Sequence, residues 1–139
     1  MSRHVLVDTG PLVAYIVEEE ALHEWAVAAL AGQPPLLLTC EAVLTEAAYL
    51  IRRAGGQPDR LLELVQRGLI VVPFVLSTKV TEVRALMKKY ANIPMSLADA
   101  SLVVMSEEFH DCTLLTLDTD FTVYRRFGNE PISVLIPPR

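Results

Sequence analysis

The chain has 139 residues, of which 52% are hydrophobic and 21% are charged, and its formal net charge at pH 7 is −5. This composition excludes an intrinsically disordered chain and favours a compact fold, which we expect to form one domain over residues 1–139. No apolar run approaches the about 20 residues that a membrane helix needs, so we expect no membrane association. The N-terminus lacks a secretory pattern, and we therefore expect a cytoplasmic protein.

Charge and cysteine content narrow the classes of function further. A net charge of −5 argues against a nucleic acid held by bulk electrostatics, although the acidic site of a nuclease would itself contribute to this charge. The only cysteines, Cys40 and Cys112, lie far apart and have no CxxC neighbour. This spacing gives neither a disulfide framework nor a zinc site, and we expect both side chains in the core.

The first half of the chain alternates short apolar runs with segments of helical periodicity. An apolar strand over residues 5–7 ends at Asp8, and Pro11 stands in the first turn of a helix over residues 11–18. The further elements expected in this half are a helix over 20–30 with Gly32 as its C-terminal cap, a strand over 36–38, a helix over 41–53 capped by Thr39, a helix over 58–67 and a strand over 69–72.

The second half continues the same alternation. Ser77 is predicted to begin a helix over 78–90, and Ser96 one over 97–109 that is apolar over most of its circumference and therefore central. A strand over 113–117, a turn over 118–121 that leads into a short helix, and a strand over 132–136 follow. Short strands that alternate with helices predict an α/β fold, in which a central, mostly parallel sheet of short strands is flanked by helices on both faces.

Four carboxylates take unusual positions in this pattern. Asp8 and Asp118 each follow an apolar strand, and open α/β sheets form their ligand crevice at the carboxyl ends of their strands. Glu46 lies within the apolar pattern of its helix, and Asp99 lies in the first turn of a nearly apolar helix. A carboxylate in such surroundings is costly unless it is paired or ligated. Four acids from four separate segments suggest a site for a hard divalent cation.

Each of these acids also has a purely structural interpretation. Asp8 is equally consistent with a helix cap, and the spacing of Ser96 and Asp99 resembles a capping box. Glu46 would point outward if the helix face were displaced by a residue or two, and residues 118–120 have the composition of a polar turn. No single acid decides between these interpretations, and the hypothesis of a site rests on their joint placement.

Four segments carry a resemblance to a known family: VLVDTGPLVAY, TEAAYLI, PMSLADASLV and LLTLDTDF. In this order, and over essentially the whole chain, they resemble the PIN-domain ribonucleases, specifically the VapC-type toxins of toxin–antitoxin pairs. The resemblance implies a PIN-like fold and endonucleolytic cleavage of RNA that leaves a 5′-phosphate, with Mg²⁺ or Mn²⁺ as the cofactor. It also implies a cognate antitoxin protein as partner and a homodimer.

The same resemblance implies roles for particular residues. It places the catalytic and metal-ligating acids of the family on Asp8, Glu46, Asp99 and Asp118, with Asp120 as an additional, more variable acid. Thr9 and Thr116 match the small hydroxyl residues that flank the family's site. Asp8, Asp99 and Asp118 are expected to bind the metal directly or through water. Glu46 is expected to ligate a second metal or to orient the attacking water.

Two other functions are kept as alternatives. A phospho-acceptor signalling domain also uses acids at strand ends with Mg²⁺, but it needs an acceptor aspartate near the middle of the chain, and no aspartate lies between Asp8 and Asp59. A catalytically inactive PIN-like binding module would keep the fold as an interaction surface, and the presence of all four acids argues against it.

Aromatic and basic side chains add candidates for binding surfaces. Tyr15, Trp25 and Tyr49 are candidates for an antitoxin groove or a dimer contact, and packing in the core is the alternative for each. The basic pairs at 52–53, 88–89 and 125–126 are candidates for phosphate contacts, and solvated charge at a helix end is the alternative.

Overall fold

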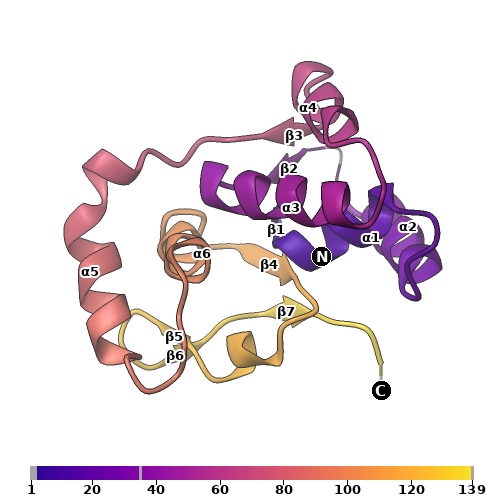
Figure 1. Ribbon diagram of the computed structural model, residues 1–139. Helices are drawn as coiled ribbons and strands as arrows, with labels where there is room; N and C mark the ends of the chain where they lie inside the picture. The colour runs from indigo at the N-terminus through magenta and orange to yellow at the C-terminus, as the bar shows by residue number, and fades with distance from the viewer. Residues whose placement is uncertain (1–2, 35, 139) are drawn as a thin grey trace.

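A sheet of five parallel strands lies at the centre of the computed structural model, which describes residues 3–34 and 36–138. Its strands are β1 (His4–Val7), β2 (Leu37–Leu38), β3 (Ile70–Val71), β4 (Cys112–Leu115) and β7 (Val134–Leu135). The order β3-β2-β1-β4-β7, which can be followed in Figure 1, places β1 in the middle. The side chains of Val5, Leu6 and Val7 are each at most 1% exposed, because a central parallel strand is covered on both faces.

The helices are α1 (Thr9–Ile16), α2 (His23–Ala31), α3 (Glu41–Arg53), α4 (Asp59–Gln66), α5 (Val80–Lys89) and α6 (Leu97–Glu108). Helix α1 packs against α2 and α3, and α4 lies beside β3. Helices α5 and α6 pack against each other on the left of Figure 1, where a long connection leads from β3 to α5. Helix α6 also contacts β1 and β4, and it is buried around most of its circumference, as predicted.

The predicted α/β class with a central parallel sheet is confirmed. Helix α3 has the predicted bounds, and most other elements differ from prediction by one to three residues at their ends. A second, antiparallel sheet of β5 (Arg125–Arg126) and β6 (Glu130–Pro131) was not predicted. Unlike β2, β3 and β7, which are equally short, β5 and β6 consist mostly of charged residues and form no apolar run. Side-chain contacts that the sequence does not reveal hold this hairpin.

Two predicted helix caps are wrong. Thr39 does not cap α3, because Cys40 takes the N-cap position and the Thr39 hydroxyl donates to the Val7 carbonyl at 2.8 Å. That hydrogen bond joins the carboxyl ends of β1 and β2. Ser77 does not begin α5 either, since it lies inside a short 3-10 helix, η1 (Leu76–Thr78), and Lys79 is the N-cap of α5.

None of the helices in the described part of the chain combines the length and the apolar character that crossing a membrane requires.

Gly10 lies in the first turn of α1, directly against the segment that follows β4. A Cβ atom built on Gly10 would lie 2.7 Å from Leu117 Cγ and 2.8 Å from Leu117 Cδ1, closer than atoms can approach without movement. The absence of a side chain at Gly10 therefore allows α1 and Leu117 to lie in contact.

We expect Gly10→Ala to destabilise the fold by about 1–3 kcal/mol, because the clash with Leu117 outweighs the better helix propensity of alanine. Gly32→Ala is the matched control, since its Cβ would meet nothing nearer than the Ala28 carbonyl oxygen at 3.5 Å. Urea denaturation of the two variants measures the difference. Equal stability of both variants would contradict the close contact between Gly10 and Leu117.

Candidate active site

The four predicted acids line one cleft of about 270 Å³. They come from four segments: Asp8 follows β1, Asp118 follows β4, Glu46 lies in α3, and Asp99 lies in the first turn of α6. Strands β1 and β4 are parallel neighbours with Val7 opposite Leu115, so that the chain leaves both strands at the same edge of the sheet. We call this hollow the acidic cleft; its other lining residues are Thr9, Gly10, Leu50 and Leu117.

Asp8 is the most buried of these acids, with 7% of its surface exposed. Its Oδ1 accepts a hydrogen bond from the Thr9 amide at 2.7 Å, and its Oδ2 accepts one from the Thr116 hydroxyl at 2.7 Å. Asp8 is thus the N-cap of α1, as its structural interpretation predicts, and it also forms a wall of the acidic cleft; its role as a metal ligand stays a prediction. The Thr116 hydroxyl, fully buried, also accepts from the Asp118 amide at 2.9 Å, and it joins the segments that carry these two acids.

Burial raises the pKa of Asp8 to about 6, and the negative charges of Asp99 and Asp118 add to this effect. The hydrogen bonds from Thr116 and Thr9 act in the opposite direction, because they stabilise the carboxylate. Burial also raises the pKa of Asp99, to which the charge of Asp118 contributes. The acids of the cleft therefore repel one another as carboxylates.

Asp99 has both of its predicted environments at once. In the capping box of α6, its amide donates to Ser96 Oγ at 3.0 Å and its Oδ2 accepts from the Ser96 amide at 3.3 Å. The same carboxylate lines the acidic cleft, where it accepts a further hydrogen bond from the Tyr124 hydroxyl at 3.3 Å. Capping and participation in the cleft are therefore compatible roles for this residue.

Tyr124, which the sequence analysis missed, contacts one of the acids of the cleft. Its ring is completely buried and makes edge contacts with Tyr90 and Phe121, so that its hydroxyl has a fixed position beside Asp99. Burial raises the pKa of this phenol, and the charge of Asp99 adds to the shift, so the hydroxyl keeps its proton as a donor. Tyr124 follows a turn and has no local pattern, so that only its tertiary position could identify it.

The position of Glu46 differs from the prediction that it lies within the apolar face of its helix. Val43, Ala47 and Ile51 form the buried face of α3, whereas Glu46 is exposed. Its Oε2 accepts from the Thr9 hydroxyl at 3.4 Å, so Glu46 and Thr9 meet at the wall of the acidic cleft. Glu46 is thus the solvent-exposed acid of the group.

The segment after β4 forms a polar turn and also contributes Asp118 to the acidic cleft. Asp118 Oδ1 accepts from the Asp120 amide at 2.9 Å and caps the 3-10 helix η2 (Thr119–Thr122). Asp120 is not among the described residues that line the acidic cleft. The backbone carbonyl of Asp120 accepts hydrogen bonds from the Val123 and Tyr124 amides, so this residue stabilises the turn.

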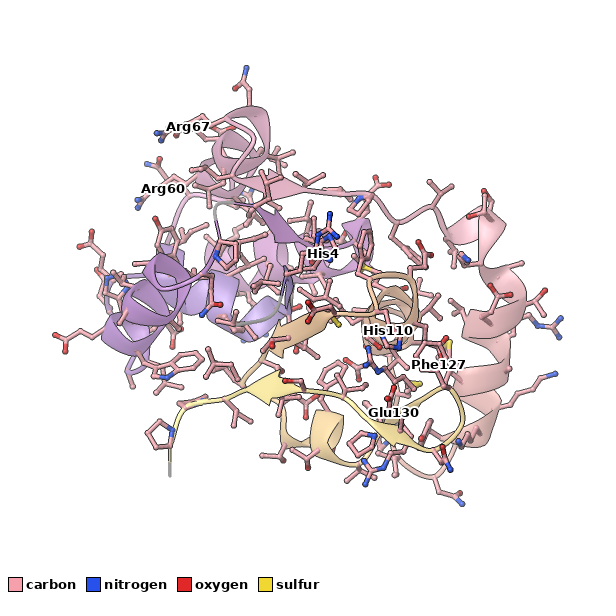
Figure 2. All side chains as sticks on the ribbon, turned by 180° about the vertical axis from the view of Figure 1, so that it is seen from behind. His4, Arg60, Arg67, His110, Phe127 and Glu130 are labelled. Atoms are coloured by element: carbon pink, nitrogen blue, oxygen red, sulfur yellow. The ribbon has the colours of Figure 1, made fainter. Side chains whose placement is uncertain are left out.

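One predicted basic pair is occupied in structural contacts. The Arg126 guanidinium forms an ion pair with Glu130 at 2.7 Å and donates to the carbonyls of Ser106 and His110. Arg125 donates to carbonyls of the preceding turn. Figure 2 shows His110, Phe127 and Glu130 gathered at this hairpin, whereas Arg60 of α4 and Arg67, the C-cap of α4, lie away from it. Arg126 therefore fastens the β5–β6 hairpin to the end of α6.

The chemistry of the acidic cleft suits a hydrated divalent cation. In residues 3–34 and 36–138, no three His, Cys, Asp or Glu side chains are already arranged to hold an ion. Mg²⁺, however, commonly keeps several of its waters and is held by only one or two carboxylates. The carboxylates of the cleft repel one another, and the pKa of Asp8 is raised to about 6. A divalent cation would relieve this repulsion and would find in these oxygens the ligands that it prefers.

Comparison with known proteins identifies the family. The family model of the PIN domain matches residues 5–126. The chain therefore belongs to the PIN-domain family, and the resemblance inferred from the sequence is confirmed. It is 24% identical over 134 residues to ribonuclease VapC26 of Mycobacterium tuberculosis, a match that covers 94% of this chain and 99% of that protein.

Two solved structures share the fold. The crystal structure of VapC20 from Mycobacterium tuberculosis, a toxin that cleaves the sarcin-ricin loop, is similar with a TM-score of 0.75 at 21% identity, over 86% of this chain and 93% of that chain. FitAcB from Neisseria gonorrhoeae is similar with a TM-score of 0.55 at 18% identity, over 94% of this chain and 96% of that chain.

The raised pKa of Asp8 makes a prediction for the metal-free protein. An acid with a pKa raised from 3.8 to about 6 contributes stability below pH 3.8, and this contribution is lost as the pH rises through about 6. Asp8→Asn removes the titration. From about pH 4.5 to about pH 7.5, the stability of Asp8→Asn should therefore increase relative to wild type by about 2 kcal/mol.

Urea denaturation of both proteins in EDTA at the two pH values measures this change. Effects of the substitution on packing and capping are the same at both pH values and cancel in the comparison. A difference between the two proteins that does not depend on pH would show that Asp8 titrates normally.

Proposed function

We propose that this protein is the ribonuclease toxin of a toxin–antitoxin pair, and that it cleaves RNA endonucleolytically with the help of Mg²⁺ or Mn²⁺. Membership of the PIN-domain family and the match to a VapC ribonuclease support the RNA-cleaving activity. The observation that carries the proposal is the meeting of Asp8, Glu46, Asp99 and Asp118 in one cleft. A metal-dependent nuclease needs such a cluster of carboxylates to hold its cation.

The residues of the cleft divide the work in this proposal. A divalent cation, when bound, lowers the pKa of a water molecule and stabilises the charge that develops on a phosphodiester. Asp8, Asp99 and Asp118 would hold the cation, directly or through water. Glu46, on the exposed wall, would ligate a second ion or orient the attacking water.

Further side chains would keep these acids in place. Thr116 bonds to the Asp8 carboxylate and to the Asp118 amide, and Thr9 lies between Asp8 and Glu46. The backbone amide of Ser96 and the hydroxyl of Tyr124 hold the Asp99 carboxylate. Fixed carboxylates avoid the cost of reorganisation during the reaction, which is the main contribution of a preorganised site.

An apolar groove supports the proposal that this protein binds a protein partner. It has a volume of about 280 Å³ and lies between α1, α2, α4 and the strands β2 and β3, with Leu12, Tyr15 and Val27 among its lining residues. We call it the helix groove. Tyr15 lines this groove and also packs against the core, as Trp25 does, whereas Tyr49 is 58% exposed on α3. In this proposal the antitoxin covers the helix groove, and the homodimer and the cytoplasmic location stay predictions.

Incubation of the purified protein with a mixture of RNAs tests the activity. We expect cleavage with Mn²⁺ or Mg²⁺, none with EDTA, and products with 5′-phosphates that a 5′-phosphate-dependent exonuclease degrades. Asp118→Asn, prepared in parallel, controls for contaminating nucleases. Cleavage that continues in EDTA in wild type alone would refute metal dependence, and failure to cut any RNA with either ion would favour the inactive binding module.

Asp99→Asn separates the two roles of Asp99 when it is compared with Ser96→Ala. Asp99→Asn should abolish cleavage and reduce the rise in melting temperature that Mn²⁺ causes, because a ligand is lost. Its metal-free stability should change little, since weaker capping and relief of carboxylate repulsion oppose each other.

Ser96→Ala removes the capping partner and keeps the Asp99 carboxylate. It should cost about 1 kcal/mol of stability and leave the response to Mn²⁺ intact. Thermal melts with and without Mn²⁺ and one RNA assay measure these effects. A fully active Asp99→Asn with an unchanged response to Mn²⁺ would restrict Asp99 to capping.

A further inference from the structure

A second hollow of about 210 Å³ adjoins the acidic cleft. The two hollows share three lining residues, Gly10, Leu50 and Leu117. The other walls of the second hollow include Val13 and Ala14 of α1 and residues 20–22, which lie between α1 and α2. We call it the side pocket. It is continuous with the place where the proposed function puts the scissile phosphate.

Leu117 forms the boundary between the two hollows. It is half-buried, it lies directly before Asp118, and its side chain packs where a Cβ of Gly10 would otherwise be. With Leu50, which is 37% exposed, it offers an aliphatic surface beside the acids. A flat ring bound against these side chains would therefore lie next to the reacting phosphate.

We propose that the side pocket binds an unstacked guanine base of the RNA substrate, at a fixed position next to the cleaved bond. This inference rests on the proposed ribonuclease function and adds a determinant of specificity to it. Proteins that recognise RNA by sequence usually bind unstacked bases, whose faces lie against protein side chains and whose Watson–Crick edges form hydrogen bonds.

The choice of guanine follows from Glu20. It is the one ionisable side chain among the described residues that line the side pocket, and it is exposed. An ionised carboxylate only accepts hydrogen bonds. The Watson–Crick edge of guanine presents two adjacent donors, N1–H and the 2-amino group, which match the two carboxylate oxygens. Adenine, cytosine and uracil each place an acceptor next to their donor, where it would face a carboxylate oxygen.

The side pocket is distinct from the helix groove that we assign to a protein partner. Gly10, Val13 and Ala14 are three and four residues apart and share one face of α1, whereas Leu12 and Tyr15 of the helix groove lie on another. The side pocket is the hollow that continues into the acidic cleft, and the helix groove shares none of the cleft's described lining residues. Position therefore favours the substrate as its occupant.

The first experiment sequences the product ends from a randomised RNA pool cut by wild type, by Glu20→Gln and by Glu19→Gln. Glu19 is also exposed and lines a different hollow, so Glu19→Gln is the matched control. We expect guanine to be enriched at one position near the cut in wild type and in Glu19→Gln. The enrichment should fall about tenfold in Glu20→Gln.

The second experiment replaces that guanine by inosine, which lacks the 2-amino group, in one oligonucleotide. Its affinity for each protein is measured by fluorescence anisotropy in EDTA, where the proposed reaction does not run. Wild type should bind the inosine oligonucleotide several-fold more weakly than the guanine one, and Glu20→Gln should bind both equally. This loss of discrimination distinguishes a contact with the base from a general effect of charge.

Failure of this inference differs from failure of the proposed function. Cleavage without a guanine preference, or a preference that Glu20→Gln leaves unchanged, would overturn the inference and leave the ribonuclease intact. Absence of all cleavage would refute the proposed function, whereas cleavage next to guanine combined with equal binding of both oligonucleotides by wild type would overturn the inference alone. If Glu20→Gln weakened inhibition by a protein partner and did not alter base preference, the side pocket would belong to that partner.

Discussion

The carboxylate of Asp8 is held in the interior at the carboxyl end of the central strand, close to other carboxylates. Burial and the neighbouring charges raise its pKa, and two hydrogen bonds, from the Thr9 amide and the Thr116 hydroxyl, offset part of the cost. Such a group weakens the fold unless something positive comes close to it. Asp8 lines the acidic cleft. A cation bound in the cleft would stabilise the ionised carboxylate and offset the cost of its burial.

The structural and functional roles of these acids support one another. Asp8 caps α1 and Asp99 lies in the capping box of α6, so the N-termini of both helices meet the acidic cleft. The positive ends of the helix dipoles partly offset the charge of the carboxylates. Thr116 links the loops after β1 and β4, and the Tyr124 hydroxyl donates a hydrogen bond to the Asp99 carboxylate. The fold thus holds mutually repelling groups in place with short-range hydrogen bonds.

Much of this arrangement could be predicted from local patterns. The strand that ends at Asp8, the bounds of α3 and the capping box of Ser96 and Asp99 depend on residues close in sequence. Contacts between distant segments could not be predicted in this way. The β5–β6 hairpin depends on Arg126 reaching the end of α6, and Tyr124 acquires its role only when its ring packs against Tyr90. The sequence left open whether Glu46 lies on the buried or the exposed face of its helix, because its apolar neighbours obscure the boundary of the buried face, and the structure shows it exposed. The roles of the four acids stay predictions.

Diffraction from crystals soaked in Mn²⁺ tests the central claim most directly, because the anomalous signal of manganese locates the ion without reference to activity. We predict an anomalous peak in the acidic cleft, within direct or water-mediated reach of Asp8, Asp99 and Asp118, and its loss on soaking in EDTA. A cleft without a peak at saturating Mn²⁺, or a peak bound only by surface acids elsewhere, would contradict the account.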